Sequence, residues 1–428
     1  MKNILIAIRS IFKKGRHNVM KIVSLGIGLA VGLVLIAKVY FEQSYDDFYP
    51  DRDRVYQVWA KYQQNGGELK DYPQTSGGIA PTMQQQIPEI ETVTRYTSFG
   101  DWTFTMTDTK MKYSGRCIIA DSCFFDILPR PMLIGNAKEV LSTPMYVLVS
   151  SRIAKNIGGD VIGKNFTVDS SPGRTMTIGG VFEEVPENSH SRYDVIVSMA
   201  SAGRFMWEGS PTNMLGNDRY ISYVKLHKGV NPLALEEQVH TFVNSYFPPE
   251  EQQKTGFNIG FSFHELDGLH KELPQVKRMT WILSLLAFAL IFTAVMNYIL
   301  IVISSIVNRS KEVAVHKCYG ASENNIHGMM FGEALVHIVL SLILALLLIL
   351  AFRGTVEELL ATSLDSLLLS NGSLVLLGIC ILVFFVSGFM PGSLYARIPV
   401  ASAFRNYREN KRIWKKALLL VQFVATGF

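Results

Sequence analysis

The sequence is poor in charged residues, which make up 18% of its 428 positions. Soluble globular proteins carry about 25%. The deficit is concentrated in four long apolar runs with almost no internal charge: 20–40, 281–307, 331–352 and 373–390. A helix of roughly 20 apolar residues crosses a hydrocarbon core, and backbone groups in lipid must be bonded within the segment. Each run is therefore predicted to be a membrane-spanning helix.

The first run also lacks the marks of a cleavable signal peptide. It has no A-x-A-like site after Tyr40, and it is longer than the apolar region of about 7–15 residues that such signals contain. We interpret it as a retained signal anchor. A fifth apolar stretch, 417–428, covers about half a span and is predicted to be the start of a further membrane helix.

Acidic residues are missing from the first 21 positions, and segment 391–416 contains a single one, Glu409. Residues 41–280 hold 23 basic and 29 acidic residues, a net charge of −6. Lys and Arg accumulate on the cytoplasmic side of membrane proteins. The predicted topology therefore has two outer segments, 41–280 and 353–372, and three cytoplasmic ones, 1–19, 308–330 and 391–416. The whole-chain charge of +5 belongs to the cytoplasmic segments and indicates no nucleic-acid partner.

One stretch, GGDVIGKN (158–165), has the spacing of a phosphate-binding loop but lacks the Ser or Thr that coordinates Mg²⁺. It lies in a segment predicted to be outside the membrane. The next residues, FTV (166–168), alternate like a strand, whereas such a loop must open a helix. We predict a turn before a strand, and no cofactor bound by this chain.

The outer segment is predicted to be an α+β domain, with two subdomains. Short β-rich stretches recur between turn clusters, at 55–59, 116–120, 146–149, 166–168, 176–181, 193–197 and 220–226. Helical patterns occur at 79–87, 151–157 and 232–246, and Asn231 is placed to cap the last of these.

The outer segment offers no convincing catalytic or metal site. HELDGLH (264–270) resembles a zinc-protease motif, but its histidines are six apart, and the motif needs a spacing of four to bring both to one helical face. No Ser–His–Asp grouping can be argued from spacing. Cys117 and Cys123 would face an oxidising compartment, so a disulfide or two free buried thiols are both open.

The membrane runs contain few polar residues. Ser24, Gly28 and Gly32 form a small-residue ridge that predicts close helix packing, either within this chain or in a dimer. Asn297 is expected to bond across helices, and His337 is expected to be a hydrogen-bonded histidine, with a water-filled path as the alternative. No chain of acidic residues suited to a proton-coupled pump is evident.

The segment between the second and third runs reads NRSKEVAVHKCYGASENNIHGMMFGEA (308–334). A charged helical extension is expected over Arg309–Lys317, ended by Gly320 in a left-handed conformation. Ser322 is placed to cap a second helix that leads into the third span. The residues alone predict an elbow on the cytoplasmic face, which as a bare connector would simply follow the positive-inside bias.

RSKEVAVHKCYGAS (309–322) resembles the R-x-K-E-[IV]-[AG]-[VI]-[RH]-K-x-x-G-A elbow of FtsX-like permeases, the membrane subunits of MacB-like ABC transporters. His316 and Cys318 depart from the residues more common there. Four outer stretches resemble the periplasmic core domain of these permeases, in order: SYDDFYPDRDRVYQV (44–58), DSCFFDILPRPMLIGNAKEVL (121–141), SSRIAKNIGGDVIGKNFTV (150–168) and GGVFEEVPENSHSRYDVIVS (179–198). KALLLVQFVATGF (416–428) is similar to the opening helix of a second permease half, as in a duplicated member.

The resemblance implies a multi-pass protein of the bacterial inner (cytoplasmic) membrane that is not itself an enzyme. ATP and Mg would be bound by a separate cytoplasmic ATPase subunit, on which the elbow would dock through Arg309, Lys311, Glu312, Lys317, Gly320 and Ala321. ATP-driven closure would move the outer domain, a mode called mechanotransmission. A second copy, or a second half of the same chain, would complete the permease.

The work done by such a permease is expected to be efflux of antimicrobial peptides, macrolides or similar compounds, with a periplasmic adaptor as a further partner. The alternative is a regulatory or sensory device that controls a cell-wall hydrolase, a signalling partner or lipoprotein release.

Overall fold

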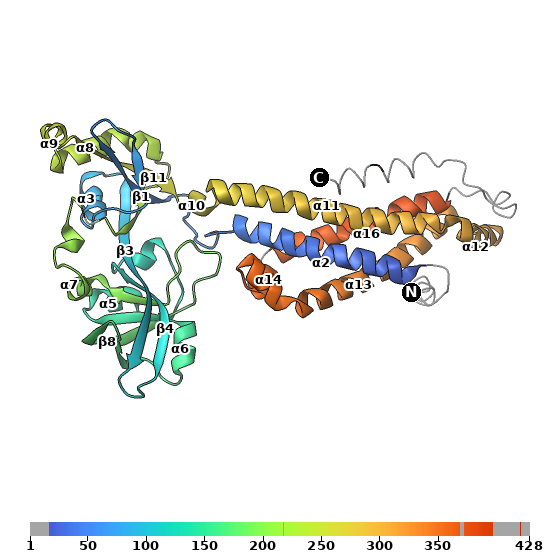
Figure 1. The fold of residues 1–428 in the computed structure, drawn as a ribbon, viewed down its shortest axis with the longest axis horizontal. Helices are drawn as coiled ribbons and strands as arrows, with labels where there is room; N and C mark the ends of the chain where they lie inside the picture. The colour runs from blue at the N-terminus through green and yellow to red at the C-terminus, as the bar shows by residue number, and fades with distance from the viewer. Residues whose placement is uncertain (1–16, 217, 369–371, 397–419, 421–428) are drawn as a thin grey trace. The chain divides into compact units, whose positions relative to one another are not determined.

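The computed structural model describes residues 17–216, 218–368, 372–396 and 420. Most of the predicted segments 1–19, 391–416 and 417–428 therefore lie outside the described residues. The chain divides into two compact units, one formed by residues 44–273 and the other by the segments before and after it (Figure 1).

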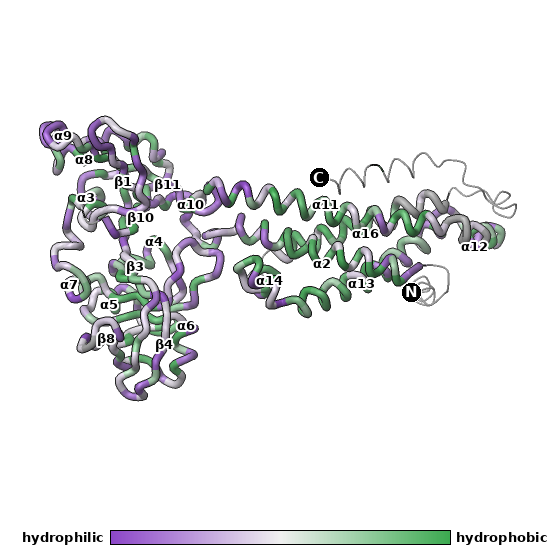
Figure 2. Tube along the Cα trace, in the orientation of Figure 1, coloured by the Kyte–Doolittle hydropathy of each residue, from purple (hydrophilic) through white to green (hydrophobic). Residues whose placement is uncertain are grey.

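The second unit is helical and consists largely of hydrophobic residues (Figure 2). Its elements are α2 (Asn18–Gln43), α11 (Pro274–Ser304), α12 (Ile306–Cys318), α13 (Glu323–Ala351), α14 (Arg353–Leu360), α15 (Leu364–Leu368) and α16 (Ser373–Ala396). Among the described residues, α2, α11 and α13 are long and apolar enough to cross a membrane. The apolar stretch described in α16 runs over Ser373–Phe389 and is shorter, so the expected fourth span stays a prediction.

The membrane helices pack through one shared core. Helix α2 lies against both α11 and α13, and α13 also lies against α16. Leu25 and Leu29 of α2 and Ile299 of α11 are completely buried in this core. At roughly 1.5–3 kcal/mol per buried aliphatic side chain in water, such burial would fold a soluble bundle. In lipid, close packing and polar contacts must replace that driving force.

The outer unit is built on one mixed sheet of 11 strands, in the order β11-β1-β10-β3-β4-β9-β6-β8-β5, with β2 on β1 and β7 on β3 and β8. The strands are β1 (Val55–Gln64), β2 (Lys70–Tyr72), β3 (Ile90–Met106), β4 (Lys112–Ala120), β5 (Met132–Ile134), β6 (Tyr146–Ser150), β7 (Asn165–Val168), β8 (Ser171–Phe182), β9 (Val195–Ser198), β10 (Ile221–Leu226) and β11 (Phe257–Glu265).

Strand β3 joins two parts of this unit, because its first residues pair with β10 and its later ones with β4 and β7. One part carries α3 (Ile79–Gln86), α8 (Glu236–Tyr246) and α9 (Pro249–Thr255), and the other carries α5 (Ala137–Ser142), α6 (Ser151–Ile157) and α7 (Ala202–Phe205) (Figure 1). Helix α4 (Phe124–Ile127) contacts both β3 and β10, and η3 (Pro232–Leu235) and η1 (Met199–Ser201) directly precede α8 and α7. Two short helices, η2 (Ser210–Thr212) and α10 (Gly268–Lys271), complete the unit. The α+β prediction is confirmed, and the two predicted subdomains share one sheet.

Two local predictions for the outer unit are confirmed by backbone geometry. Gly158 and Gly163 have positive φ angles of 75° and 78°, and β7 begins two residues after Gly163, so GGDVIGKN is a turn before a strand. Asn231 caps the following helix, because its side chain accepts a hydrogen bond from the Leu233 N–H at 3.0 Å.

Candidate functional site

The elbow between α11 and α13 is the candidate functional site. Helix α11 ends at Ser304, and Ser305 separates it from α12. The Ser305 hydroxyl donates to the Val302 carbonyl at 2.6 Å, which satisfies a carbonyl at the helix end. The apolar span and the charged extension are therefore two helices with a break at Ser305, rather than the continuous helix that the sequence predicts.

The turn after α12 is a complete Schellman motif. Gly320 has φ +85°, its N–H donates to the Lys317 carbonyl at 3.0 Å, and the Ala321 N–H donates to the His316 carbonyl at 3.0 Å. Ser322 then caps α13 by accepting from the Asn325 N–H at 3.3 Å. The predicted left-handed Gly320 and the predicted Ser322 cap are both confirmed, and together they fix the angle of the elbow.

The elbow has a buried side and an exposed side. Val313 and Ala314 of α12 are each 1% exposed and belong to the core of the membrane helices. Tyr319, at the turn, is 89% exposed. An aromatic side chain held outward on a rigid turn is suited to a protein interface, where tyrosine contributes large contact area at low entropy cost.

The predicted coupling residues occupy this elbow in different ways. Glu312 and Lys317 are half-buried, Ala321 is half-buried, and Gly320 is exposed. Arg309 and Lys311 lie in α12, but their side chains fall outside the described part of the structure. The backbone places all six on α12 or on the turn that follows it.

The small-residue ridge on α2 packs within the chain. A Cβ atom added at Gly28 would meet the Ala294 side chain of α11, and one added at Gly32 would meet Ile291 of the same helix. Both additions would be too close for real Cβ contacts. Ser24, one turn earlier, is half-buried, and so is Asn297 on α11. The intrachain alternative therefore accounts for Gly28 and Gly32.

An ion pair that the sequence did not predict joins α2 to α13. Lys21 Nζ lies 3.8 Å from Glu333 Oε1, and the two side chains are 0% and 8% exposed. Asn18 Oδ1 also accepts from Lys21 Nζ at 3.2 Å. Glu333 is in the helix that begins at the elbow, so the pair connects the elbow helix to the helix that precedes the outer domain in the chain. The only sequence signal was a charge near the end of each apolar run.

Three further polar contacts lie in the helical unit. The Tyr298 hydroxyl of α11 lies 3.2 Å from His337 Nδ1 of α13, which places His337 in a buried hydrogen bond, as expected. Lys38 of α2 pairs with Glu42 at 2.6 Å and donates to the Thr362 hydroxyl at 2.7 Å. Buried groups of this kind are expensive in a membrane unless they are paired.

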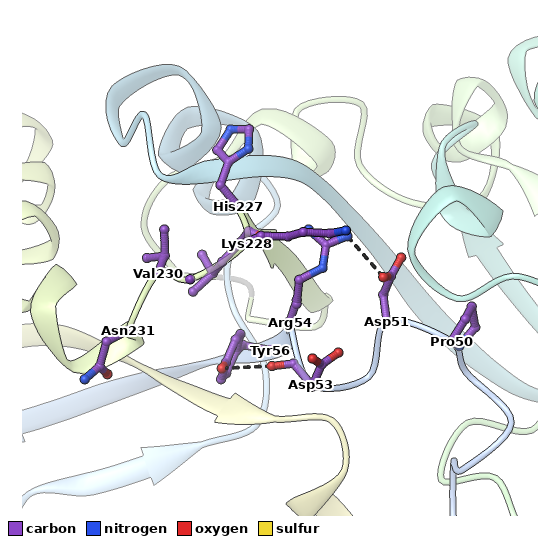
Figure 3. Close-up of a pocket in the computed structure, with 11 residues that line it drawn as sticks. Pro50, Asp51, Asp53, Arg54, Tyr56, His227, Lys228, Val230 and Asn231 are labelled. Carbon is purple, nitrogen blue, oxygen red and sulfur yellow. Dashed lines mark hydrogen bonds and ion pairs between the residues drawn. The ribbon is translucent and has the colours of Figure 1, made fainter.

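The outer unit contains a polar cavity of about 610 Å³ at the start of β1 and the end of β10 (Figure 3). Its charges largely neutralise each other: Asp51 pairs with Lys225 at 2.5 Å and with Arg54 at 3.1 Å, and Arg54 also pairs with Glu91 at 2.7 Å. Hydrogen bonding from Lys225 holds the pKa of Asp51 below its usual value, and Arg54 does the same for Glu91. The ion pairs beside this cavity join the residues just before β1 to β3 and β10.

These pairs predict acid sensitivity. Because both folded pKa values are lowered, their contribution to stability is present above the ordinary values of 3.8 and 4.5 and is lost as pH falls through the lowered values. Both carboxylates are more than a third exposed, so we expect about 1 kcal/mol or less from each. Thermal unfolding between pH 3 and pH 7 should show a weaker acid-side decline in the double variant D51N/E91Q. Identical pH profiles would contradict the assignment.

The zinc-protease-like stretch HELDGLH and the two cysteines are the remaining candidates in the outer unit. His264 is in β11, where its ring stacks on Trp59, and His270 is in α10, where it stacks on Tyr45. All four cysteines are free, including Cys117 and Cys123, so the disulfide alternative is not adopted. Burial raises the pKa of both the Cys117 and Cys123 thiols, which makes them poor nucleophiles. Within the described residues, His, Cys, Asp and Glu form no metal-sized group.

The chain matches two protein-family models. Residues 20–242 match the family model of the MacB-like periplasmic core domain, and residues 284–400 match that of the FtsX-like permease C-terminal region. No curated protein matches the chain.

Two solved structures are similar to about half of the chain. One is a domain of a protein described as a permease from Porphyromonas gingivalis, with 32% identity, 51% of this chain and 91% of that chain covered, and a TM-score of 0.47. The other is the extracellular domain of the noncanonic ABC-type transporter YknZ from Gram-positive bacteria, with 10% identity, 48% and 98% coverage, and a TM-score of 0.34.

The first family match alone spans more than half of the chain, and the second covers the elbow and the helices around it. An outer α+β unit and an FtsX-like helical region thus occur in one polypeptide. The chain belongs to the family of MacB-like and FtsX-like ABC transporter permeases.

Proposed function

We propose that this chain is the non-catalytic permease subunit of an ABC transporter, which converts ATP hydrolysis by a separate cytoplasmic ATPase into motion of its outer domain. The observation that carries the proposal is the elbow, with buried Val313 and Ala314 on one side and exposed Tyr319 on the other. A force that the ATPase applies to the exposed side of this turn would be transmitted to the membrane helices packed on its buried side.

The contacts of α13 would transmit this force from the elbow to α2. Helix α13 begins at Glu323, directly after the elbow. It contacts α2 through the Lys21–Glu333 pair and through the Ser341 hydroxyl, which donates to the Ile22 carbonyl at 3.1 Å. Helix α2 is followed directly by the outer unit. A rigid helix and paired polar contacts are the kind of physical connection through which coupling can travel.

The proposal includes the topology and the partners. The N-terminus and the elbow would lie in the cytoplasm of the bacterial inner membrane, with lipid around α2, α11, α13 and α16. ATP and Mg would be held by the ATPase. A second copy of the permease, or a second half of the same chain, would complete the assembly, and a periplasmic adaptor would extend it.

For cargo, we propose efflux of amphipathic compounds such as antimicrobial peptides or macrolides. A cavity of about 360 Å³ in the outer unit supports this class, because it is lined by the aromatic rings of Tyr62, Phe247 and Phe257 together with a few polar groups. Tyr62 donates to Asp218 at 2.5 Å, so the polar edge of the cavity is fixed. Apolar walls with a few oriented polar groups are typical of small-molecule sites.

The elbow supplies the test. In the full-length protein co-expressed with its ATPase, the charge reversals Glu312→Lys and Lys317→Glu should each lower the amount of ATPase recovered at least ~10-fold, because like charges at an interface cost several kcal/mol. Pull-down from membranes with quantitative mass spectrometry measures this. The matched control is Glu68→Lys, an exposed reversal in the outer unit that should change nothing.

Normal ATPase recovery and normal transport by Glu312→Lys would refute the coupling role. The same purification distinguishes efflux from regulation. An adaptor recovered with the ATPase supports efflux. A cell-wall hydrolase or signalling protein in its place would refute efflux and support a regulatory device. Recovery of no ATPase from the wild type, under conditions that keep known complexes together, would refute the proposal as a whole.

A further inference from the structure

A third cavity of the outer unit, about 370 Å³ in volume, has a lining that differs from those of the other two. It is bordered by Tyr45, Arg116, His190, Arg192 and His270, with Ser189 and two leucines completing the wall. Of the described residues that line it, two are arginines, two are histidines and none carries a carboxylate. A concave surface with this composition favours an anionic ligand.

The two arginines have donors to spare. The Arg116 guanidinium lies 3.9 Å, at its Nε, from the Asp101 carboxylate, and both side chains are mostly exposed, so the pair is weak. The Asp194 carboxylate accepts from the Arg116 backbone N–H at 3.0 Å and is itself paired with Arg152 at 2.6 Å. Arg192 donates from one Nη2 to the Glu187 carbonyl. A guanidinium has five N–H donors in a planar fork, and that geometry matches the oxygens of phosphate.

The wall between the arginines is held rigidly from beneath. Asp46 is fully buried and accepts from His190 Nδ1 at 2.8 Å and from the Ser189 hydroxyl at 3.1 Å. His190 Nε2 lies 2.5 Å from the hydroxyl of buried Tyr223. Because both ring nitrogens are hydrogen-bonded, rotation of the imidazole is restrained. Fixed polar walls lower the cost of binding because less has to be ordered.

Two of the lining residues are close in the chain to the helices that flank the outer unit. Tyr45 follows the last residue of α2 by two positions, and Leu273 immediately precedes α11. Two residues of chain span at most about 7 Å. The stacked rings of Tyr45 and His270, with centroids 3.5 Å apart, therefore belong to a part of the chain where aromatic residues are typical of the membrane–water interface.

From this combination we infer that the cavity is a binding site for a phosphate-bearing anion, held by Arg116 and Arg192 against the rigid Asp46–His190–Tyr223 wall. Two sources present that chemistry next to a membrane helix: the headgroup of an anionic phospholipid and free phosphate. The inference concerns the outer unit alone and does not depend on ATPase coupling.

The test uses the full-length protein in detergent micelles, titrated by calorimetry with dihexanoyl-phosphatidylglycerol in one arm and with inorganic phosphate in the other. We expect the double variant R116Q/R192Q to bind at least ~10-fold more weakly than the wild type, because charge-assisted bonds to phosphate are lost. The matched control is Arg204→Gln, which removes an exposed arginine of α7 elsewhere in the same unit.

Binding of the lipid probe alone, dependent on the two arginines, would identify a headgroup site, and binding of both probes would show that the phosphate group suffices; either result supports the inference. Failure of both probes to bind the wild type would overturn it. So would equal binding by the double variant, once its unfolding temperature has been shown to match that of the wild type. Should the double variant be unstable, the single variant Arg192→Gln should still weaken binding.

Discussion

Reversing the charge of Lys21 should disable the permease, and reversing its partner as well should restore it. Lys21→Glu would place two carboxylates at a site where the wild-type side chains are 0% and 8% exposed. Breaking a buried ion pair costs about 3–5 kcal/mol, because one charge is left buried without compensation. The reciprocal double variant K21E/E333K recreates an opposite-charge pair between α2 and α13, so its stability and coupling should recover in large part.

Two readouts on the full-length protein with its ATPase in lipid nanodiscs measure this prediction. Thermal unfolding reports stability, and the distance between a spin label in the outer unit and one at the end of α11 reports motion during ATP turnover. The control is the exchange K38E/E42K, because that buried pair lies within α2 and links no second span to it directly. The exchange should change stability without abolishing motion.

The prediction is wrong if Lys21→Glu unfolds and moves like the wild type, or if the double exchange is no better than either single change. A third variant separates charge from packing. Replacing both residues with apolar ones, K21M/E333L, removes the need to bury charge and should leave the helices stably packed. If motion is then lost while stability is kept, the ion pair itself is needed to transmit force.

The contact between Lys21 and Glu333 could not be predicted from the sequence. Lys21 contributed to the prediction of membrane topology, since it is one of six basic residues among the first 21 positions, and Glu333 was read as part of an apolar run. Their contact depends on how α2 and α13 pack, and a single sequence contains no record of that packing. The elbow was predictable because its signals are local: Gly320 supplies the left-handed turn and Ser322 the cap, each within a few residues of the helix that it ends or begins.

In the outer unit too, an element with a local sequence signal was predicted and elements without one were missed. Helix α6 was predicted over 151–157 and occupies those residues, since the Ser150 side chain caps it by accepting from the Ile153 N–H. Strand β3, over 90–106, was missed although it is the longest strand described. Its register shifts between Ser98 and Gly100, and such a bulge reverses the alternation of buried and exposed residues on which strand prediction depends. Strand β11 was missed because Gly260 and His264 interrupt its apolar pattern, and most of its residues are only half-buried at the sheet edge.

Adding side chains to the α2 ridge should separate α2 from α11. In the double variant G28V/G32V, each new Cβ would meet the side chain of Ala294 or Ile291 at a distance that atoms do not tolerate. Overpacking costs roughly 1–3 kcal/mol per site, and helices in lipid have no hydrophobic drive to compensate for lost contact. We expect a sharp fall in unfolding temperature and in the yield of folded protein.

The matched control for this pair is Gly378→Val in α16, where an added Cβ meets no described atom within 4 Å. The same change in residue type in another apolar helix should then have little effect, so that any loss in the double variant reflects the contact and not the removal of glycine. Size-exclusion chromatography with light scattering decides between the two uses of the ridge. A double variant that keeps the wild-type unfolding temperature but changes its oligomeric state would place Gly28 and Gly32 in a contact between copies. Loss of stability at an unchanged oligomeric state would place them in the packing of α2 on α11, as the structure has them.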